Sequence, residues 1–146
     1  MSNYFGGAAW AVPFLADQDL TAKQWTHVGA ASTYGSVASA NTGCNPGPIG
    51  VLVNDPSAGQ EATVVVFGFT KAKCRVLGGC ILRQGAWLKA ASDGLFETVG
   101  ANDNPKFARY FGPQEATTDT SVIGNIFFAA NPAACGVNAA SGNSYS

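Results

Sequence analysis

The sequence predicts an all-β fold, a small β-barrel or β-sandwich with little helix. β-Branched and aromatic residues alternate with small or polar residues over short runs, most clearly in residues 61–76. Turn residues (Gly, Pro, Asn and Asp) separate these runs at intervals of about 8 to 12 residues, which is typical of small barrels and sandwiches. A chain of 146 residues can bury a core of its own, so we expect one β-domain.

An extended N-terminal arm is predicted to precede this domain. Trp10 and its apolar neighbours should be buried against another surface, but a Gly-Gly pair and Pro13 disfavour any regular element around them. We divide the chain into the arm (1–20), the β-domain (21–130) and a C-terminal tail rich in Ser, Asn and Gly (131–146).

The first half of the β-domain is expected to hold three short strands and one long strand. Residues 26–37 combine valines with Gly, Ser and Tyr34, which predicts two strands around a turn. Residues 49–53 form a short buried run, and the turn residues of 54–59 connect it to a long strand that starts at Glu61.

Three cations share one face of this long strand. Lys71, Lys73 and Arg75 alternate with small apolar residues, so the strand period places the cations on the opposite side from them. The row can contact a protein neighbour, be a solvated face or bind nucleic acid. The net charge of −1 and the absence of interleaved aromatic residues argue against direct contact with nucleic acid.

The second half is predicted to continue as short strands linked by hairpins. Strands are expected at residues 80–83, 87–91 and 95–99, and the Asp-Gly pair before the last of these is the strongest hairpin signal in the chain. The polar insertion 101–114 is expected to contain one short helical turn from Lys106 to Tyr110. A final strand is predicted at residues 122–129.

The residues that carry chemistry do not form a recognisable catalytic or metal-binding pattern. His27 has no carboxylate or cysteine close in sequence to orient it as a base. Asp17 and Asp19 are expected on a solvated edge, Asp93 in a turn, and Glu97 facing solvent. We therefore predict a protein that is not an enzyme and has no cofactor and no bound metal, with a structural or surface role for His27.

The cysteines match neither a CxxC pair nor a zinc-ribbon spacing. Buried free thiols are the expected state of all four, which are Cys44, Cys74, Cys80 and Cys135.

The composition predicts a chain that buries much of its surface against partners. Only 12% of the residues are charged, about half the usual share, so the surface has few solvating groups. The start of the chain does not resemble a signal peptide, and no run approaches the ~20 apolar residues of a membrane span. We expect a protein made in the cytosol and used in soluble form, without membrane contact.

Several segments in order resemble the small capsid cement, or decoration, proteins of tailed bacteriophages. They are LADQDLTAKQW, GPIGVLVNDPSAGQEATVVVFGFTKAK, GAWLKAASDGLFETV and SVIGNIFF, which together span residues 15–128. The closest agreement with the family pattern lies in the second segment, where twelve positions match: Gly50, Val51, Leu52, Asn54, Pro56, Ala58, Gly59, Ala62, Val64, Val66, Gly68 and Lys71. The Gln60-Glu61 pair, the insertion 101–114 and the cysteines depart from that pattern.

The resemblance implies a compact, tulip-like all-β domain on the exterior of a phage capsid. Such proteins bind the major capsid protein and stabilise its lattice, usually as homotrimers, with a dimer as the alternative. The contacts expected here come from the arm and from the cationic row: Tyr4, Phe5, Trp10, Phe14, Leu15, Lys71, Lys73 and Arg75. A different class of function is a carbohydrate-binding β-domain of a virion surface or fibre protein that would use Trp25, Trp87 and Tyr110.

Overall fold

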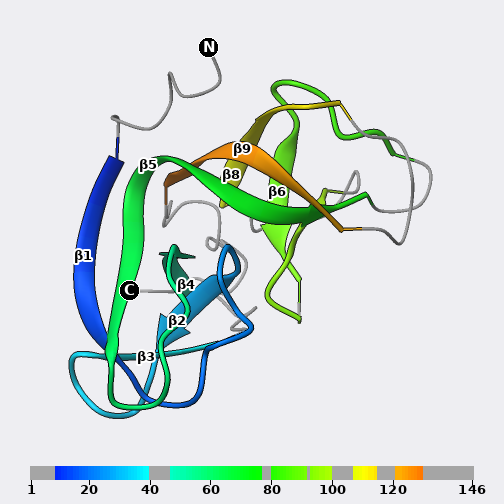
Figure 1. Ribbon diagram of the computed structural model, residues 1–146. Coiled ribbons are helices and arrows are strands. Elements are labelled where there is room, and N and C mark those ends of the chain that lie inside the picture. Colours follow the sequence, from blue (N-terminus) through cyan, green and yellow to red (C-terminus); the bar gives the residue numbers. More distant parts are fainter. Residues whose placement is uncertain are drawn as a thin grey trace, which may run out of the picture.

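The computed structural model describes residues 9–39, 47–76, 80–91, 93–99, 107–114 and 121–129, which form nine β-strands and no helix (Figure 1). The predicted all-β fold is therefore confirmed. The strands are β1 (Ala9–Ala16), β2 (His27–Ala30), β3 (Ser36–Ser39), β4 (Pro48–Leu52), β5 (Glu61–Arg75), β6 (Trp87–Ala90), β7 (Phe96–Thr98), β8 (Ala108–Gly112) and β9 (Ser121–Ala129).

The strands close into two rings of five that share β5. The order β1-β3-β2-β4-β5 closes because β1 also pairs with β5, and we call this the first ring. The order β5-β7-β6-β8-β9 closes because β9 also pairs with β5, and this is the second ring. Closure pairs the strand edges internally, which removes most of the unpaired backbone that an open sheet would expose.

The shared strand β5 passes from one ring to the other near Gly68. At this point β5 lies between β1, where Ala9 is opposite Gly68, and β9, where Phe128 is opposite the same glycine. The backbone φ of Gly68 is 118°, a conformation that favours glycine because it has no Cβ. Figure 1 shows β5 bending sharply where it leaves β1 and joins β9.

The first ring encloses its own apolar core. On β5, Ala62 and Val64 point inward and are fully buried. Val28 of β2, Leu52 of β4 and Leu20, which follows β1, complete the centre of this core with no exposed surface.

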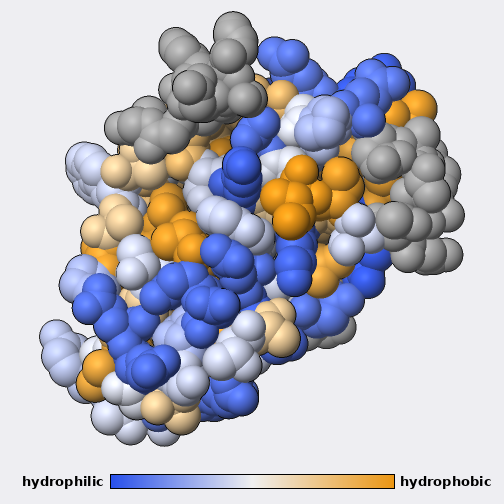
Figure 2. Space-filling view, in the orientation of Figure 1, coloured by the Kyte–Doolittle hydropathy of each residue, from blue (hydrophilic) through white to orange (hydrophobic). Residues whose placement is uncertain are grey.

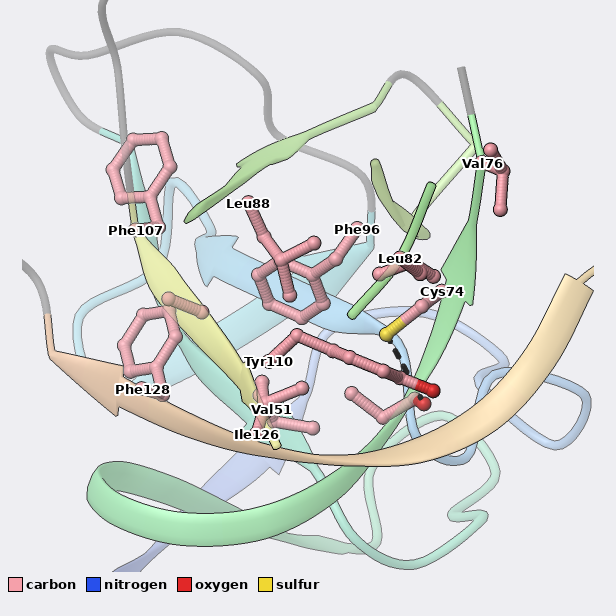
Figure 3. Packing of buried hydrophobic residues seen from close by; sticks show 12 residues of the cluster. Val51, Cys74, Val76, Leu82, Leu88, Phe96, Phe107, Tyr110, Ile126 and Phe128 are labelled. Atoms are coloured by element: carbon pink, nitrogen blue, oxygen red, sulfur yellow. Dashed lines mark hydrogen bonds between the residues drawn. The ribbon is translucent and has the colours of Figure 1, made fainter. Parts of the chain in front are cut away.

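The second ring encloses a larger core that contains most of the buried aromatic residues. Figure 3 shows Leu88, Phe96, Tyr110 and Ile126 converging from four strands toward Cys74 of β5. All five side chains are fully buried. The fully buried side chains of β5 that line the two cores thus occupy even-numbered positions, as the period of two predicts, although the odd-numbered Val65 between them is also buried.

Part of the predicted N-terminal arm belongs to the first ring. The prediction that Pro13 prevents a regular element there is wrong, because Ala9–Ala16 form β1 and pair with Glu61 to Gly68 of β5. Up to Phe14, β5 is the only described strand that pairs with β1. The missing N–H of Pro13 is therefore tolerable, since proline is accepted on an edge strand.

Two local predictions in the second half are also corrected. The expected helical turn ending at Tyr110 is instead β8, in which Ala108 and Tyr110 are buried and Arg109 is exposed. Residues 80–83 do not form a full strand, and only Leu82 makes an isolated bridge there.

The other turn-linked strands agree with the sequence predictions. β6 and β7 pair as an antiparallel hairpin around Asp93 and Gly94, with Leu88 opposite Thr98 and Ala90 opposite Phe96. β2 and β3 pair around the turn that contains Tyr34. β4 and β5 pair across the turn that contains Gly59.

The structure describes two of the four cysteines, and both are free thiols. Cys74 is buried, and desolvation raises the pKa of its thiol to about 12, so this thiol is protonated at neutral pH. Cys80 is half-buried. Cys44, Cys135 and the C-terminal tail lie outside the described residues.

Candidate functional site

A continuous row of aromatic side chains crosses the outer face of the shared strand. Ring centroids are 5.4 Å apart for Trp10 and Phe67, 5.2 Å for Phe67 and Phe127, 4.9 Å for Phe127 and Phe69, and 5.5 Å for Phe69 and Phe111. The row therefore runs over β1, β5, β9 and β8, and we call it the aromatic stripe. Each contact lies in the range of favourable aromatic pairing.

The stripe leaves apolar surface open to solvent. Trp10 is 71% exposed and Phe67 is 44% exposed, and Ile123, farther along the outer face of β9, is 48% exposed. In Figure 2 apolar residues gather on the side where β1 and the first half of β5 lie, and again where β5 and β9 cross. Neighbouring exposed apolar residues of this kind mark interaction surfaces more often than isolated ones do.

The same outer face continues from the stripe to an exposed tryptophan. Arg109 of β8 lies opposite Phe127 on one side and opposite Trp87 of β6 on the other. Its guanidinium carbon is 4.4 Å from the centre of the Trp87 ring, so one face of this ring carries a cation–π contact.

The three aromatic residues predicted for glycan binding do not form one platform. Tyr110 is fully buried, with its hydroxyl donating a hydrogen bond to the carbonyl of Pro113. The prediction that Tyr110 can stack on a sugar is therefore wrong. Trp87 is exposed but is already stacked by Arg109, and Trp25 is half-buried.

The cationic row lies on the outer face of β5, directly after the stripe. Lys71 is exposed and Lys73 and Arg75 are half-buried, while the alternating Ala72 and Cys74 are fully buried. The predicted segregation of cations and small apolar residues to opposite faces is therefore confirmed.

Arg75 differs from the two lysines because it is held in an ion-pair cluster. Its guanidinium lies 2.8 Å from a carboxylate oxygen of Asp93 and 2.8 Å from one of Glu97, and Lys89 lies 3.9 Å from Glu97. The hydrogen bond from Arg75 to Glu97 contributes most to raising the pKa of the guanidinium. Glu97 is thus a partner of Arg75 and not the solvent-facing residue that its alternation suggested. The cluster ties the β6–β7 hairpin to the end of β5.

The predicted contact residues of the arm lie on β1 or before it. Trp10 and Leu15, which is 53% exposed, present their side chains to solvent, and Phe14 is half-buried against the first core. Tyr4 and Phe5 lie outside the described residues. The structure therefore brings Trp10 together with the aromatic residues of β5 and β9, whereas Leu15 lies near the other end of β1.

His27 links the two rings from a fully buried position. Its backbone N–H donates to Gly94 O at 2.9 Å, and its Nε2 lies 2.8 Å from Ala91 O, both in the β6–β7 hairpin. Phe96 packs edge-on against the imidazole with a centroid distance of 5.4 Å. Nδ1 is buried without a hydrogen-bond partner. Of the two roles predicted for His27, the structural one is correct.

Burial lowers the pKa of His27, although the bond to Ala91 and the nearby charge of Asp93 oppose this shift. The imidazole is therefore neutral in the folded protein near neutral pH, with Nε2–H donating to Ala91 O. Protonation would place a charge and an unpaired N–H in the junction between the rings.

We expect the free energy of unfolding to fall as the pH is lowered from 7 to 5. The unfolded chain takes up a proton on this histidine near its ordinary pKa of 6.5, while the folded protein resists protonation, so acid favours unfolding. Denaturant unfolding at several pH values should show this slope in the wild type. The His27→Gln variant keeps an N–H donor for Ala91 but cannot titrate, so its slope should be smaller.

Equal slopes in the two proteins would contradict this role of His27. Titration of the nearby Asp93 does not affect the comparison of the two slopes. Burial alone would raise the pKa of its carboxyl, but the hydrogen bond and charge of Arg75 lower it on balance, so its protonation weakens the fold only at more acidic pH.

Among the described residues, no group of three or more His, Cys, Asp or Glu side chains lies close enough to hold a metal ion. The same part of the chain contains no helix long and apolar enough to span a membrane. The most distinctive surface is therefore the aromatic stripe with the lysines beside it. Alternation alone places Phe67 and Phe69 on the face of the lysines, but the partners from β1, β8 and β9 depend on the tertiary pairing.

The fold and this surface define an all-β domain of two strand rings with an apolar outer face. The solved structure of the N base of head fiber gp8.5 in bacteriophage phi29 has a similar fold, with a TM-score of 0.52 and 15% sequence identity. The match covers 82% of this chain and 92% of that chain. No protein-family model matches the sequence. No curated protein matches it.

Proposed function

We propose that this chain is a structural protein of the bacteriophage head, located on the capsid exterior, where it binds the major capsid protein and stabilises its lattice. The observation that carries the proposal is the fold shared with a phage head fiber base over 82% of this chain and 92% of the other. The sequence resemblance to capsid cement proteins over residues 15–128 supports the same class of function. The chain would act without catalysis and without a cofactor.

The surface of the domain supports a role in protein contact. The exposed apolar residues of β1 and β5 would lose contact with water on binding, which is the main favourable contribution in most protein associations. The low charged fraction of 12% reduces the cost of removing polar groups from water at such an interface. Self-association as a trimer on the capsid is part of this proposal, with a dimer as the alternative.

The first contact would come from β1. Trp10 and Leu15 are exposed, and over residues 9–14 this strand pairs with β5 alone among the described strands. A strand with one unpaired edge can accept an extended segment of a partner through main-chain hydrogen bonds. Lys71 and Lys73 would form the second contact, while Arg75 is already paired with Asp93 and Glu97.

Cosedimentation with expanded heads that lack this protein tests the proposal. We expect the purified chain to bind such heads and to raise the temperature at which they release DNA. A Trp10→Ser/Leu15→Ser variant should bind at least about tenfold more weakly, because it loses two apolar contacts. Ile81→Ser is the matched control, since Ile81 is an apolar residue that is 38% exposed and lies on the segment before β6, not on β1.

Absence of wild-type binding to heads would overturn the proposed function. Wild-type binding that Trp10→Ser/Leu15→Ser leaves unchanged would overturn the assignment of β1 as the contact.

A further inference from the structure

The aromatic stripe and two lysines form one continuous face on the shared strand. Phe67, Phe69, Lys71 and Lys73 occupy alternate positions of β5 and therefore project from the same side. Apolar surface thus changes to cationic surface along about 20 Å of a single strand, given a rise of about 3.3 Å per residue. An extended partner laid along β5 would meet the two kinds of surface in sequence.

The two lysines are not neutralised by acidic neighbours within the described part of the protein. The ion pairs found there join Arg75 and Lys89 to Asp93 and Glu97, and none involves Lys71 or Lys73. On the adjoining strand β9, Lys71 lies opposite Asn125 and Lys73 opposite Ile123, both uncharged. Carboxylates of a partner would therefore complement this end of the face.

We propose that the outer face of β5 binds an extended protein segment whose apolar residues contact the aromatic stripe and whose following acidic residues pair with Lys71 and Lys73. This inference rests on the proposed function for the source of the segment, a capsid protein. Its chemistry is nevertheless testable on the purified chain alone.

Two other occupants fit the same face less well. A second copy docked around a two-fold axis would leave the lysines of both copies without carboxylate partners, because such an interface joins the same patch from both subunits and this patch has no acidic residue. Single-stranded nucleic acid needs open ring faces and a strongly basic groove. Here Phe67, Phe69 and Phe127 meet edge to face and cover part of each ring, and the net charge of the chain is −1.

A peptide-binding titration tests the proposal. The probe is a fluorescein-labelled peptide that alternates leucine and serine in its first half and glutamate and serine in its second half. We expect its anisotropy to rise with added protein, and we expect the binding to weaken with salt. A peptide with lysine in place of glutamate should bind at least about fivefold more weakly.

Single substitutions locate the binding face. Lys71→Glu and Phe67→Ser should each weaken binding of the acidic peptide at least about fivefold. Arg83→Glu and Ile81→Ser are the matched controls, because both residues are exposed and lie outside the face, and they should leave binding within about twofold of the wild type. All four positions are exposed, so the variants should fold, which circular dichroism and thermal unfolding will verify.

The proposal is overturned if the wild type does not bind the acidic peptide, if both peptides bind equally, or if the control variants lose binding as strongly as the test variants. Tighter binding of an oligothymidine strand would also overturn it, in favour of nucleic acid. Oligomers of the wild type that Phe67→Ser disperses would overturn it in favour of a self-interface. Peptide binding without head binding would retain this proposal and reject the proposed function, so the two failures are distinguishable.

Discussion

The Gly50→Ala variant is expected to lose about 3 kcal/mol of stability, because β4 pairs closely with β5 and leaves no room for a side chain at this position. A Cβ on Gly50 would lie 2.4 Å from the backbone carbonyl oxygen of Val65 and 2.4 Å from Cγ1 of Val64. Both distances are far below van der Waals contact, and the carbonyl belongs to the shared strand. Relief would require β4 to move away from β5, which opens the first ring and separates apolar residues on both sides of it.

Denaturant unfolding of Gly50→Ala beside Gly59→Ala separates this clash from the general effect of adding a methyl group. Gly59 has a φ of 83° and open space around it, so its substitution introduces backbone strain alone and should cost about 1 kcal/mol. A loss for Gly50→Ala no larger than that for Gly59→Ala would contradict the account of the close approach.

Residues in local turns and hairpins could be placed correctly from the sequence. The Asp93-Gly94 hairpin depends on turn residues that are adjacent in sequence, and the shared face of Lys71 and Lys73 depends only on the strand period of two. Both features could therefore be predicted without knowledge of distant contacts. The twelve matched positions that suggested a capsid protein also cluster around one such turn.

The closure of the rings could not be predicted because it depends on pairings between distant segments. Pro13 discouraged the assignment of β1, but a proline is tolerated where a strand has one unpaired edge, and that edge exists only in the folded protein. The parallel pairing of Cys74 with Phe96 joins segments that no short turn connects. Topology of this kind follows from the fold as a whole.

For the same reason, only part of the candidate surface could be predicted from the sequence. The cationic row is local to β5, but Trp10, Phe111 and Phe127 reach Phe67 and Phe69 only after β1, β8 and β9 have paired around it. The sequence suggested that no aromatic residue accompanies the cations. In the folded protein the aromatic stripe lies directly beside Lys71, which makes this face both apolar and cationic.

Deletion of residues 1–20 should unfold the first ring and remove more than about 5 kcal/mol of stability, comparable to the whole stability of many small domains. The deletion removes β1, which pairs with seven residues of β5 and closes the ring through β3. It also removes the buried side chains of Ala16 and Leu20, so Val28 and Val64 lose packing partners in the core of the first ring. Circular dichroism and denaturant unfolding should show loss of the cooperative transition.

A full-length Trp10→Ser/Leu15→Ser variant should instead stay within about 1 kcal/mol of the wild type, because both side chains are largely exposed. Retention of a cooperative transition by the truncated chain would show that residues 1–20 are an appendage and not a structural part of the ring. If the truncated chain loses its cooperative transition, its failure to bind heads would show only that it is unfolded, and not that residues 1–20 contact the capsid. Point substitutions on the exposed side of β1 are therefore the changes that can separate contact from stability, because β1 supports the ring with one face and presents the other to solvent.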